Sequence, residues 1–406
     1  MNTSRESTEF SPERLSRITS LLQGYVDRGE LAGMIATVAR HAQTVYYEKF
    51  GWMDCEAHKP MCDDAIFLIA SMTKPITSVA IMMLYEEGRF HLNTPIAKFI
   101  PAFKDVKVFF RQTEHGLDLV PLQQDITFRH LFTHTSGLSY GDSAEDPVDR
   151  MYQSASRRME ETKIPMTNKR LVDELVKMSL AFQPGTKWRY SLSIDVLGYL
   201  IEVISGLPLE VFLEERLFKP LGMVDTRFYI PPEQAGRLAT MYGNPKAGSG
   251  LQRIEQIKPP FEQPTWASGG GGLTSTVHDY ARFAQMLTNG GELDGVRLLS
   301  PKTVALYSLN HAPEEVLPYG IQDNDLYHWG YGYSLGTRVL MNVSKSGIAG
   351  SVGEFGWDGA FSTYFWVDRK EALYGLLMLQ HNPNTYYPIH QLHQQFKQLT
   401  YQALVE

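Results

Sequence analysis

Ser71 and Lys74 are the two residues whose spacing most directly suggests chemistry. They lie in Ser71-Met72-Thr73-Lys74, where an apolar run changes into a helical pattern. Residues at i and i+3 share one helix face, so the two side chains are within reach of each other. A serine hydroxyl needs a neighbouring base to take its proton, and burial can lower the pKa of a lysine enough for that task. The spacing predicts a serine nucleophile at the start of a helix, although an ordinary serine-capped helix has the same pattern.

Several further segments make this context specific, and together they carry a family resemblance. They are residues 126–138, residues 182–185 with Trp188-Arg189-Tyr190-Ser191, and residues 218–223, 269–273, 275–276 and 298–301. With the serine–lysine segment they resemble the penicillin-binding protein and class C β-lactamase superfamily over about residues 15–400. Within that superfamily the chain most resembles the family VIII carboxylesterases and the related cytosolic acyltransferases. The resemblance implies a serine hydrolase that works through an acyl-enzyme.

Two departures from the β-lactamase pattern favour an uncharged acyl substrate. Where those enzymes have Tyr-x-Asn, this chain has Tyr190-Ser191-Leu192, and leucine cannot hydrogen-bond a substrate amide. Where they have Lys-Thr-Gly, this chain has Trp357-Asp358-Gly359, which replaces a carboxylate-binding cation with an aromatic side chain. Lys345-Ser346-Gly347 is the alternative third motif, but Trp357 stands directly before the penultimate predicted strand and is favoured for that reason.

The resemblance also implies roles for the residues of these motifs. Ser71 would be the nucleophile, and Lys74, Tyr190 or the two as a coupled pair would move its proton, with the identity of the base left open. The backbone N–H groups of Ser71 and Ala360 would form the oxyanion hole. The residues expected to contact the substrate are Trp357, Asp358, Gly359 and Leu192. No metal and no cofactor is expected to take part.

Other motifs that could do chemistry are weaker. Residues 137–141 match G-x-S-x-G around Ser139, but a nucleophile elbow follows a buried strand and none is predicted there. His134 is expected to fix its loop. Residues 269–272 are all glycine but lack a following lysine, which indicates a flexible loop beside the cleft. His390 and His393, without a third ligand, indicate a solvated face of the last helix.

The predicted elements place these motifs in an α+β fold. A helix begins after Ser11, strands at residues 34–39 and 44–50 form a hairpin, and strands at residues 362–367 and 373–379 precede a closing helix. Antiparallel strands from both ends of the chain can share one sheet, with both terminal helices covering a face. The middle is predicted as mostly helix and loop, with helices at residues 73–87, 171–178, 194–204 and 276–287.

The predicted organisation is an α/β sandwich domain with a helical insertion. Residues 1–75 and 235–406 would form the sandwich, residues 76–234 would form the helical domain, and the active site would lie at their interface. Residues 139–165 and 240–265 are predicted loops that shape the substrate pocket, because loops vary most on a shared scaffold.

Composition limits the partners. The 406 residues carry a net charge of −7 without any basic block, so neither nucleic acid nor a membrane surface is an expected partner. Two cysteines are too few for a disulfide scaffold. No apolar stretch has the length of a signal peptide or a membrane span, and a cytoplasmic location is expected.

The hypothesis is therefore a hydrolase whose partner is a small-molecule ester. The alternatives are a β-lactamase or D-Ala-D-Ala-type peptidase, an acyltransferase to an alcohol, and a catalytically silent relative that binds or assembles. The sequence identifies neither the natural substrate nor the oligomeric state.

Overall fold

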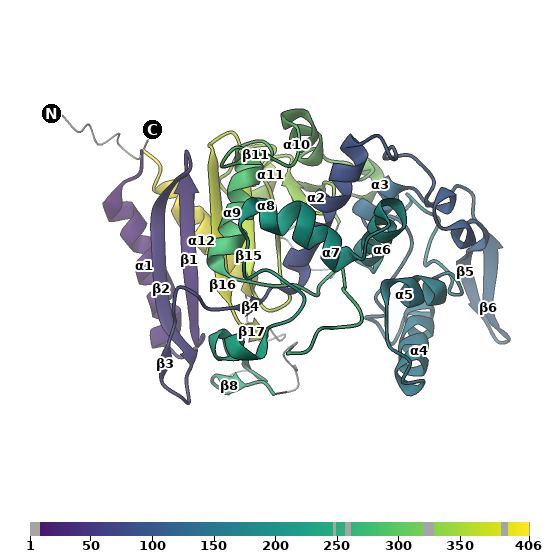
Figure 1. Cartoon of the computed structure of the whole chain (residues 1–406), viewed down its shortest axis with the longest axis horizontal. Coiled ribbons are helices and arrows are strands. Elements are labelled where there is room, and N and C mark those ends of the chain that lie inside the picture. The colour runs from purple at the N-terminus through teal and green to yellow at the C-terminus, as the bar shows by residue number, and fades with distance from the viewer. Residues whose placement is uncertain (1–8, 247–248, 256–260, 320–328, 383–388, 406) are drawn as a thin grey trace.

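The two ends of the chain meet in one eight-stranded antiparallel sheet (Figure 1). The computed structural model describes residues 9–246, 249–255, 261–319, 329–382 and 389–405. Within the sheet, β1 (Gly33–Arg40) pairs with β2 (Gln43–Asp54) on one side and with β16 (Leu373–Leu379) on the other. The sheet is completed by β3 (Lys59–Pro60), β12 (Tyr331–Tyr333), β13 (Arg338–Leu340), β14 (Phe355–Asp358) and β15 (Tyr364–Asp368). The prediction that strands from both ends share a sheet is confirmed.

Both faces of the sheet are buried over β1, β15 and β16, because alternate side chains along these strands pack on different layers of helices, whereas most residues of β2 are exposed or half-buried. On β1, Met34 and Val38 pack with α1 (Pro12–Asp27) and α12 (Ile389–Gln402) in one apolar cluster. Ile35 faces the other way, into the large core that includes α2 (Thr73–Glu86) and α9 (Val277–Thr288). The sheet is thus the middle layer, and the terminal helices cover one face as predicted (Figure 1).

Capping residues set the ends of the predicted helices. The Ser11 side chain accepts a hydrogen bond from the Arg14 N–H at the start of α1, and Thr276 accepts one from the Asp279 N–H at the start of α9. Gly206 ends α6 (Ser193–Ser205) with a φ of 77°, a left-handed conformation that favours glycine. The predicted helix at residues 171–178 begins earlier, as α5 (Asn168–Leu175).

The middle of the chain contains two elements that the sequence pattern did not predict. A β-hairpin, β5 (Lys107–Thr113) with β6 (Gly116–Pro121), lies at the end of the molecule opposite α1 (Figure 1). Its strands show no one-sided apolar alternation, and Phe110 is 63% exposed. A 15-residue helix, α4 (Pro147–Glu161), occupies most of the segment predicted as the loop 139–165. The loop prediction was wrong, because α4 is largely polar and lacks a long apolar pattern. The cap that begins this helix is Asp146, whose side chain accepts hydrogen bonds from the Val148 and Asp149 N–H groups.

The remaining elements are short. They are α3 (Phe128–Phe132), α7 (Leu209–Leu213), a π-helical turn (Glu214–Phe218), α8 (Lys219–Leu221), α10 (Pro301–Tyr307), α11 (Val343–Ser346), β4 (Phe67–Leu68), β7 (Tyr242–Gly243), β8 (Gln252–Arg253), β9 (Thr274–Ser275), β10 (Glu292–Leu293), β11 (Val296–Arg297) and β17 (His381–Asn382). Both cysteines, Cys55 and Cys62, are free.

No single helix among the described residues is long and apolar enough to cross a membrane. In the part of the chain that the structure describes, only α6 together with residues 209–221 reaches that length and hydropathy, and the two parts are bent by 80°. The expectation of no signal peptide rests partly on the first eight residues, which lie outside the described residues. Residues 247–248 and 256–260 of the predicted loop 240–265 also lie outside them.

Candidate active site

Ser71 lies in a 3₁₀ turn, Ala70–Met72, that leads directly into α2. Ala70 has a φ of 42°, in the left-handed region that a residue with a side chain rarely adopts. Such backbone strain persists only where the surroundings hold it. Leu273 stabilises this turn from both sides. Its carbonyl oxygen accepts a hydrogen bond from the Ile69 N–H, and its own N–H donates one to Thr73 Oγ1. The turn therefore presents Ser71 at the N-terminal end of a helix.

Lys74 lies one turn along, as the sequence spacing predicted. Its Nζ is 3.1 Å from Ser71 Oγ and donates a hydrogen bond of 2.6 Å to the Gly270 carbonyl oxygen. The side chain is completely buried. Burial lowers the pKa of Lys74 to about 7, against the opposing effect of the nearby carboxylates, of which Asp195 has the largest effect. A lysine in this state can give up and take a proton near neutral pH.

Tyr190 comes from a distant segment and completes the predicted set. The Lys74 Nζ lies 4.5 Å from the centre of the Tyr190 ring. The phenol oxygen accepts a hydrogen bond of 3.2 Å from Trp357 Nε1. Burial raises the pKa of Tyr190, and hydrogen bonds with Ser71 and Trp357 only partly oppose that rise. The phenol therefore stays protonated near neutral pH, whereas the Lys74 amine can lose its proton there.

The turn after β14 lies against the nucleophile turn. A Cβ added to Gly359 would be 2.4 Å from the Ile69 carbonyl oxygen, so the two backbones approach more closely than a side chain allows. The Gly359 N–H is used, because it donates to the Thr363 carbonyl oxygen at 2.8 Å. Among the described residues, the Ala360 N–H has no hydrogen-bond partner. Ala360 thus keeps a free donor on the segment that touches the chain just before Ser71.

Trp357 and Asp358 point to opposite faces of β14. Trp357 is buried in the large core with Tyr333, whose ring centre is 5.3 Å away. The Asp358 carboxylate forms an ion pair of 3.0 Å with Arg338, which is 4% exposed. Asp358 is therefore engaged in a structural contact, and its predicted contact with substrate stays a prediction. Leu192, half-buried directly before α6, stays a predicted substrate contact.

The glycine-rich residues 269–272 are held in place, which differs from the predicted flexible loop. The Gly269 carbonyl oxygen accepts a hydrogen bond from Thr77 Oγ1 at 2.8 Å, and the Gly270 N–H donates to Asp195 Oδ1 at 3.1 Å. A Cβ on Gly270 would lie 2.3 Å from Asp195 Oδ2. Glycine is thus required at residue 270 for the close backbone approach to Asp195. Sequence reasoning missed Asp195, because an acidic residue in the first turn of a helix is common.

The rival motifs are structural. Ser139 is buried, its hydroxyl donates to Asp149 and accepts from the Gly141 N–H, and no strand precedes it. His134 is buried, with Nδ1 3.1 Å from Ser191 Oγ. Lys345-Ser346-Gly347 forms the end of the short helix α11, where Gly347 has a φ of 67°.

The predicted solvated face of the last helix is wrong for His393. His393 is 1% exposed, stacks on Tyr364 with ring centres 4.5 Å apart, and has Nε2 2.9 Å from the Ser362 carbonyl oxygen. Within the described ranges, no group of three or more His, Cys, Asp or Glu side chains could hold a metal ion.

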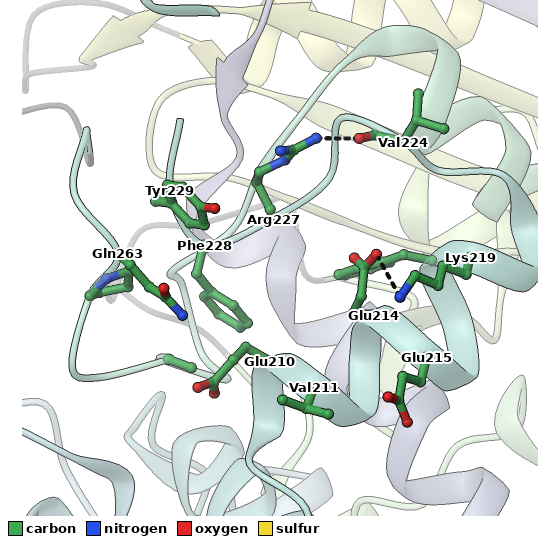
Figure 2. A pocket seen from close by; sticks show the side chains of 13 residues that line it. Glu210, Val211, Glu214, Glu215, Lys219, Val224, Arg227, Phe228, Tyr229 and Gln263 are labelled. Atoms are coloured by element: carbon green, nitrogen blue, oxygen red, sulfur yellow. Dashed lines mark hydrogen bonds and ion pairs between the residues drawn. The ribbon is translucent and has the colours of Figure 1, made fainter. Parts of the chain in front are cut away.

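A groove of about 400 Å³ borders the same glycine-rich segment but does not contain the candidate catalytic residues (Figure 2). Glu210, Val211 and Glu214 line it from the helical side, and Phe228 and Ala267 line it from the side of the segment. A Cβ on Gly272 would lie 2.9 Å from the Phe228 ring, so that ring packs directly on the glycine-rich segment.

Comparisons with known proteins identify the family and the fold of the chain. The family model named Beta-lactamase matches residues 18–397. Protein Rv1367c of Mycobacterium tuberculosis (strain ATCC 25618 / H37Rv) is 34% identical over 364 residues, which cover 88% of each chain. Esterase EstB of Burkholderia gladioli is 29% identical over 396 residues, which cover 92% of this chain and 93% of EstB. Unliganded simvastatin synthase (LovD) from Aspergillus terreus has a TM-score of 0.81 at 22% identity, covers 96% of this chain and 98% of its own, and shows the fold alone. The predicted superfamily and α+β fold are confirmed.

Proposed function

Because this chain belongs to the beta-lactamase family, we propose that it is a serine hydrolase that cleaves small carboxylic esters through an acyl-enzyme on Ser71. The observation that carries the proposal is the fully buried Lys74 amine 3.1 Å from Ser71 Oγ. Burial brings the pKa of that amine to about 7, which suits a general base at neutral pH.

In the first half-reaction the neutral Lys74 amine accepts the Ser71 proton. One Lys74 N–H is already directed at the Gly270 carbonyl oxygen, which fixes the orientation of the amine. Ser71 Oγ then forms a bond to the ester carbonyl carbon, and the carbonyl electron pair moves to oxygen. The N–H groups of Ser71 and Ala360 would receive that oxyanion, and each such donor typically contributes a factor of about 10²–10³ in rate.

Collapse of the tetrahedral intermediate breaks the bond to the alcohol. The proton held by Lys74 passes to the departing oxygen, and Tyr190, protonated and hydrogen-bonded with Ser71, is the group that relays it. In the second half-reaction water attacks the acyl-Ser71 carbonyl carbon, and the same groups remove the proton of that water. The bond between Ser71 Oγ and the acyl carbon breaks, the carboxylic acid is released, and Ser71 regains its proton.

The walls of the site favour an uncharged substrate. Trp357 replaces the lysine that would pair with a carboxylate, and its ring lies 5.8 Å from the ring of Tyr190. The nearby cation Arg338 is buried and ion-paired with Asp358, so it is unsuited to bind a substrate anion. Aromatic walls suit apolar acyl groups.

A substrate panel tests this proposal. Chromogenic esters of short and medium acyl chains, nitrocefin and a D-Ala-D-Ala peptide are compared by kcat/KM, with intact-mass detection of acylated protein. We expect the highest kcat/KM for an ester and an acyl adduct on Ser71. A higher kcat/KM for nitrocefin would identify a β-lactamase, and product ester formed with an added alcohol would identify an acyltransferase. Folded protein that neither turns over any substrate nor reacts with a fluorophosphonate would be a silent relative.

A further inference from the structure

Asp195 is a buried carboxylate directly behind the candidate general base. It lies in the first turn of α6, five residues after Tyr190, and is 1% exposed. Its Oδ1 accepts hydrogen bonds from Ser268 Oγ at 2.6 Å and from the Gly270 N–H at 3.1 Å. Gly270 in turn binds Lys74 through its carbonyl oxygen. One residue therefore connects the carboxylate of Asp195 to the amine of Lys74.

The second oxygen of this carboxylate is not used for structure. Asp195 Oδ2 is buried and has no hydrogen-bond partner among the described residues. Burying an acid in this state is costly unless a nearby cation compensates. Burial raises the pKa of Asp195, and Lys74 is the largest influence in the opposite direction. A purely structural clamp for Ser268 and Gly270 would not need a charge, because a neutral amide oxygen accepts the same two hydrogen bonds.

The other groups around Lys74 leave Asp195 as its main counter-charge. Asp358 and Asp142 also favour the charged form of Lys74, with smaller effects than Asp195. Asp358 is already ion-paired with Arg338. The aromatic neighbours Tyr140 and Tyr190 are neutral near pH 7, because burial raises the pKa of both phenols. Burial also keeps His134 neutral, by lowering its pKa well below the usual value.

We propose that Asp195 is a positioning residue with two effects on Lys74. Through Gly270 it fixes the carbonyl group that orients the amine, and through its charge it sets the pH at which the amine becomes free to act as a base. This inference rests on the proposed role of Lys74, and it adds a residue outside the three motifs of the family resemblance.

The test separates the two effects by substituting Asp195. Asp195→Asn keeps the oxygen that accepts from Ser268 and Gly270 but removes the charge, whereas Asp195→Ala removes both. The readout is the rate constant for fluorophosphonate labelling of Ser71, followed by intact mass over about pH 5 to pH 9, where the acidic limb reports the pKa of the base. Labelling needs no deacylation, so it reports the activation of Ser71 alone.

For Asp195→Asn we expect the acidic limb to move to lower pH by at least about half a unit, because loss of a neighbouring negative charge disfavours the charged amine. Asp195→Ala should in addition lower the labelling rate on the plateau. Asp279→Asn is the matched control, since Asp279 is also a fully buried acid in a first helical turn and is not among the charges acting on Lys74. It should leave the limb unmoved.

Two results would overturn the inference, and only the second would also remove the proposed function. A limb that stays at the wild-type pH in folded Asp195→Asn, or moves to higher pH, would exclude the charge effect while leaving Ser71 as a nucleophile. Absence of Ser71 labelling in the wild-type protein would remove the proposed function and this inference together. Unfolding by guanidinium chloride, measured for each variant, establishes that the labelled molecules are folded.

Discussion

The indole N–H of Trp357 donates a hydrogen bond of 3.2 Å to the phenol oxygen of Tyr190. This contact joins β14 of the sheet to the segment before α6, two parts of the chain that are 167 residues apart. In this contact the Tyr190 oxygen accepts a hydrogen bond from Trp357. The Tyr190 O–H proton therefore stays available on the side of Ser71. The aromatic residue that replaces the family's lysine therefore holds a candidate catalytic residue in position.

The first prediction follows from this contact. Trp357→Phe keeps an aromatic side chain but removes the donor, so Tyr190 loses one restraint on its orientation. One neutral hydrogen bond is worth about 0.5–1.5 kcal/mol, so we expect kcat/KM for a chromogenic ester to fall about 3- to 10-fold. Trp366→Phe is the control, because Trp366 is equally buried but lies on the opposite face of the sheet with α12. Equal kcat/KM for Trp357→Phe and the wild type would contradict the prediction.

The sequence predicted those parts of the site that depend on local spacing. Ser71 and Lys74 share a helix face by geometry alone, and the strands of the sheet have clear apolar patterns. Contacts between segments that are distant in the sequence could not be predicted in the same way. The opposite orientations of Trp357 and Asp358 follow from strand alternation. The ion pair of Asp358 with the buried Arg338 depends on the pairing of β14 with β13, which the sequence does not reveal.

The elements that were missed have physical reasons. The hairpin β5–β6 is mostly exposed, with Val108 as its one buried residue, so its residues lack the alternation that marks a half-buried strand. Helix α4 is mostly polar, so the composition of its segment resembles that of a loop. The four glycines at residues 269–272 suggested flexibility, because the sequence does not reveal that Thr77, Asp195 and Phe228 occupy the space where side chains would be.

The second prediction distinguishes the two candidate nucleophiles. Ser71→Ala should reduce ester turnover by at least about 10³-fold, because removal of the nucleophile leaves only the binding and oxyanion contributions. Ser139→Ala should retain turnover and lose stability by about 1–3 kcal/mol, since it leaves Asp149 and the Gly141 N–H without their buried partner. The measurements are ester hydrolysis and urea unfolding. Loss of turnover in folded Ser139→Ala, with turnover kept in Ser71→Ala, would reverse the assignment.

The third prediction concerns the pH dependence of activity. Since burial brings the pKa of Lys74 to about 7, the amine is protonated below that pH and free above it. We expect kcat/KM to rise as pH increases through about 7 and then to level off. Lys74→Met should abolish this limb together with nearly all activity. A profile that is flat between pH 5 and pH 8 in the wild type would exclude Lys74 as the titrating base.

The fourth prediction transfers the same shift to stability. The pKa of Lys74 is about 7 in the fold against an ordinary value of 10.5, so between these values the unfolded chain binds a proton that the folded chain does not. The free energy of unfolding should therefore increase with pH in this window, with the penalty complete below about pH 7 and lost as pH approaches 10.5. The slope for one proton is about 1.4 kcal/mol per pH unit. Measured by urea unfolding, the difference between the wild type and Lys74→Met should show this slope, and a constant difference would contradict it.

The fifth prediction concerns a buried ion pair behind the sheet, between Glu354 and Lys397 of α12. Both side chains are 2% exposed. Tyr401 Oη donates a hydrogen bond of 2.9 Å to Glu354, and Lys397 donates one of 2.9 Å to Tyr331 Oη. The pair ties the last helix to the residue directly before β14, the strand that carries Trp357.

Glu354→Gln should leave the Lys397 charge buried without its counter-ion and reduce the free energy of unfolding by about 3–5 kcal/mol. The double variant Glu354→Gln with Lys397→Met should recover part of that loss, because it removes the unpaired charge as well. Guanidinium chloride unfolding measures both values, and the rate of Ser71 labelling in the absence of denaturant serves as the control, since it should not change in either folded variant. A loss below about 1 kcal/mol in the single variant would mean that water reaches Lys397 and replaces the carboxylate.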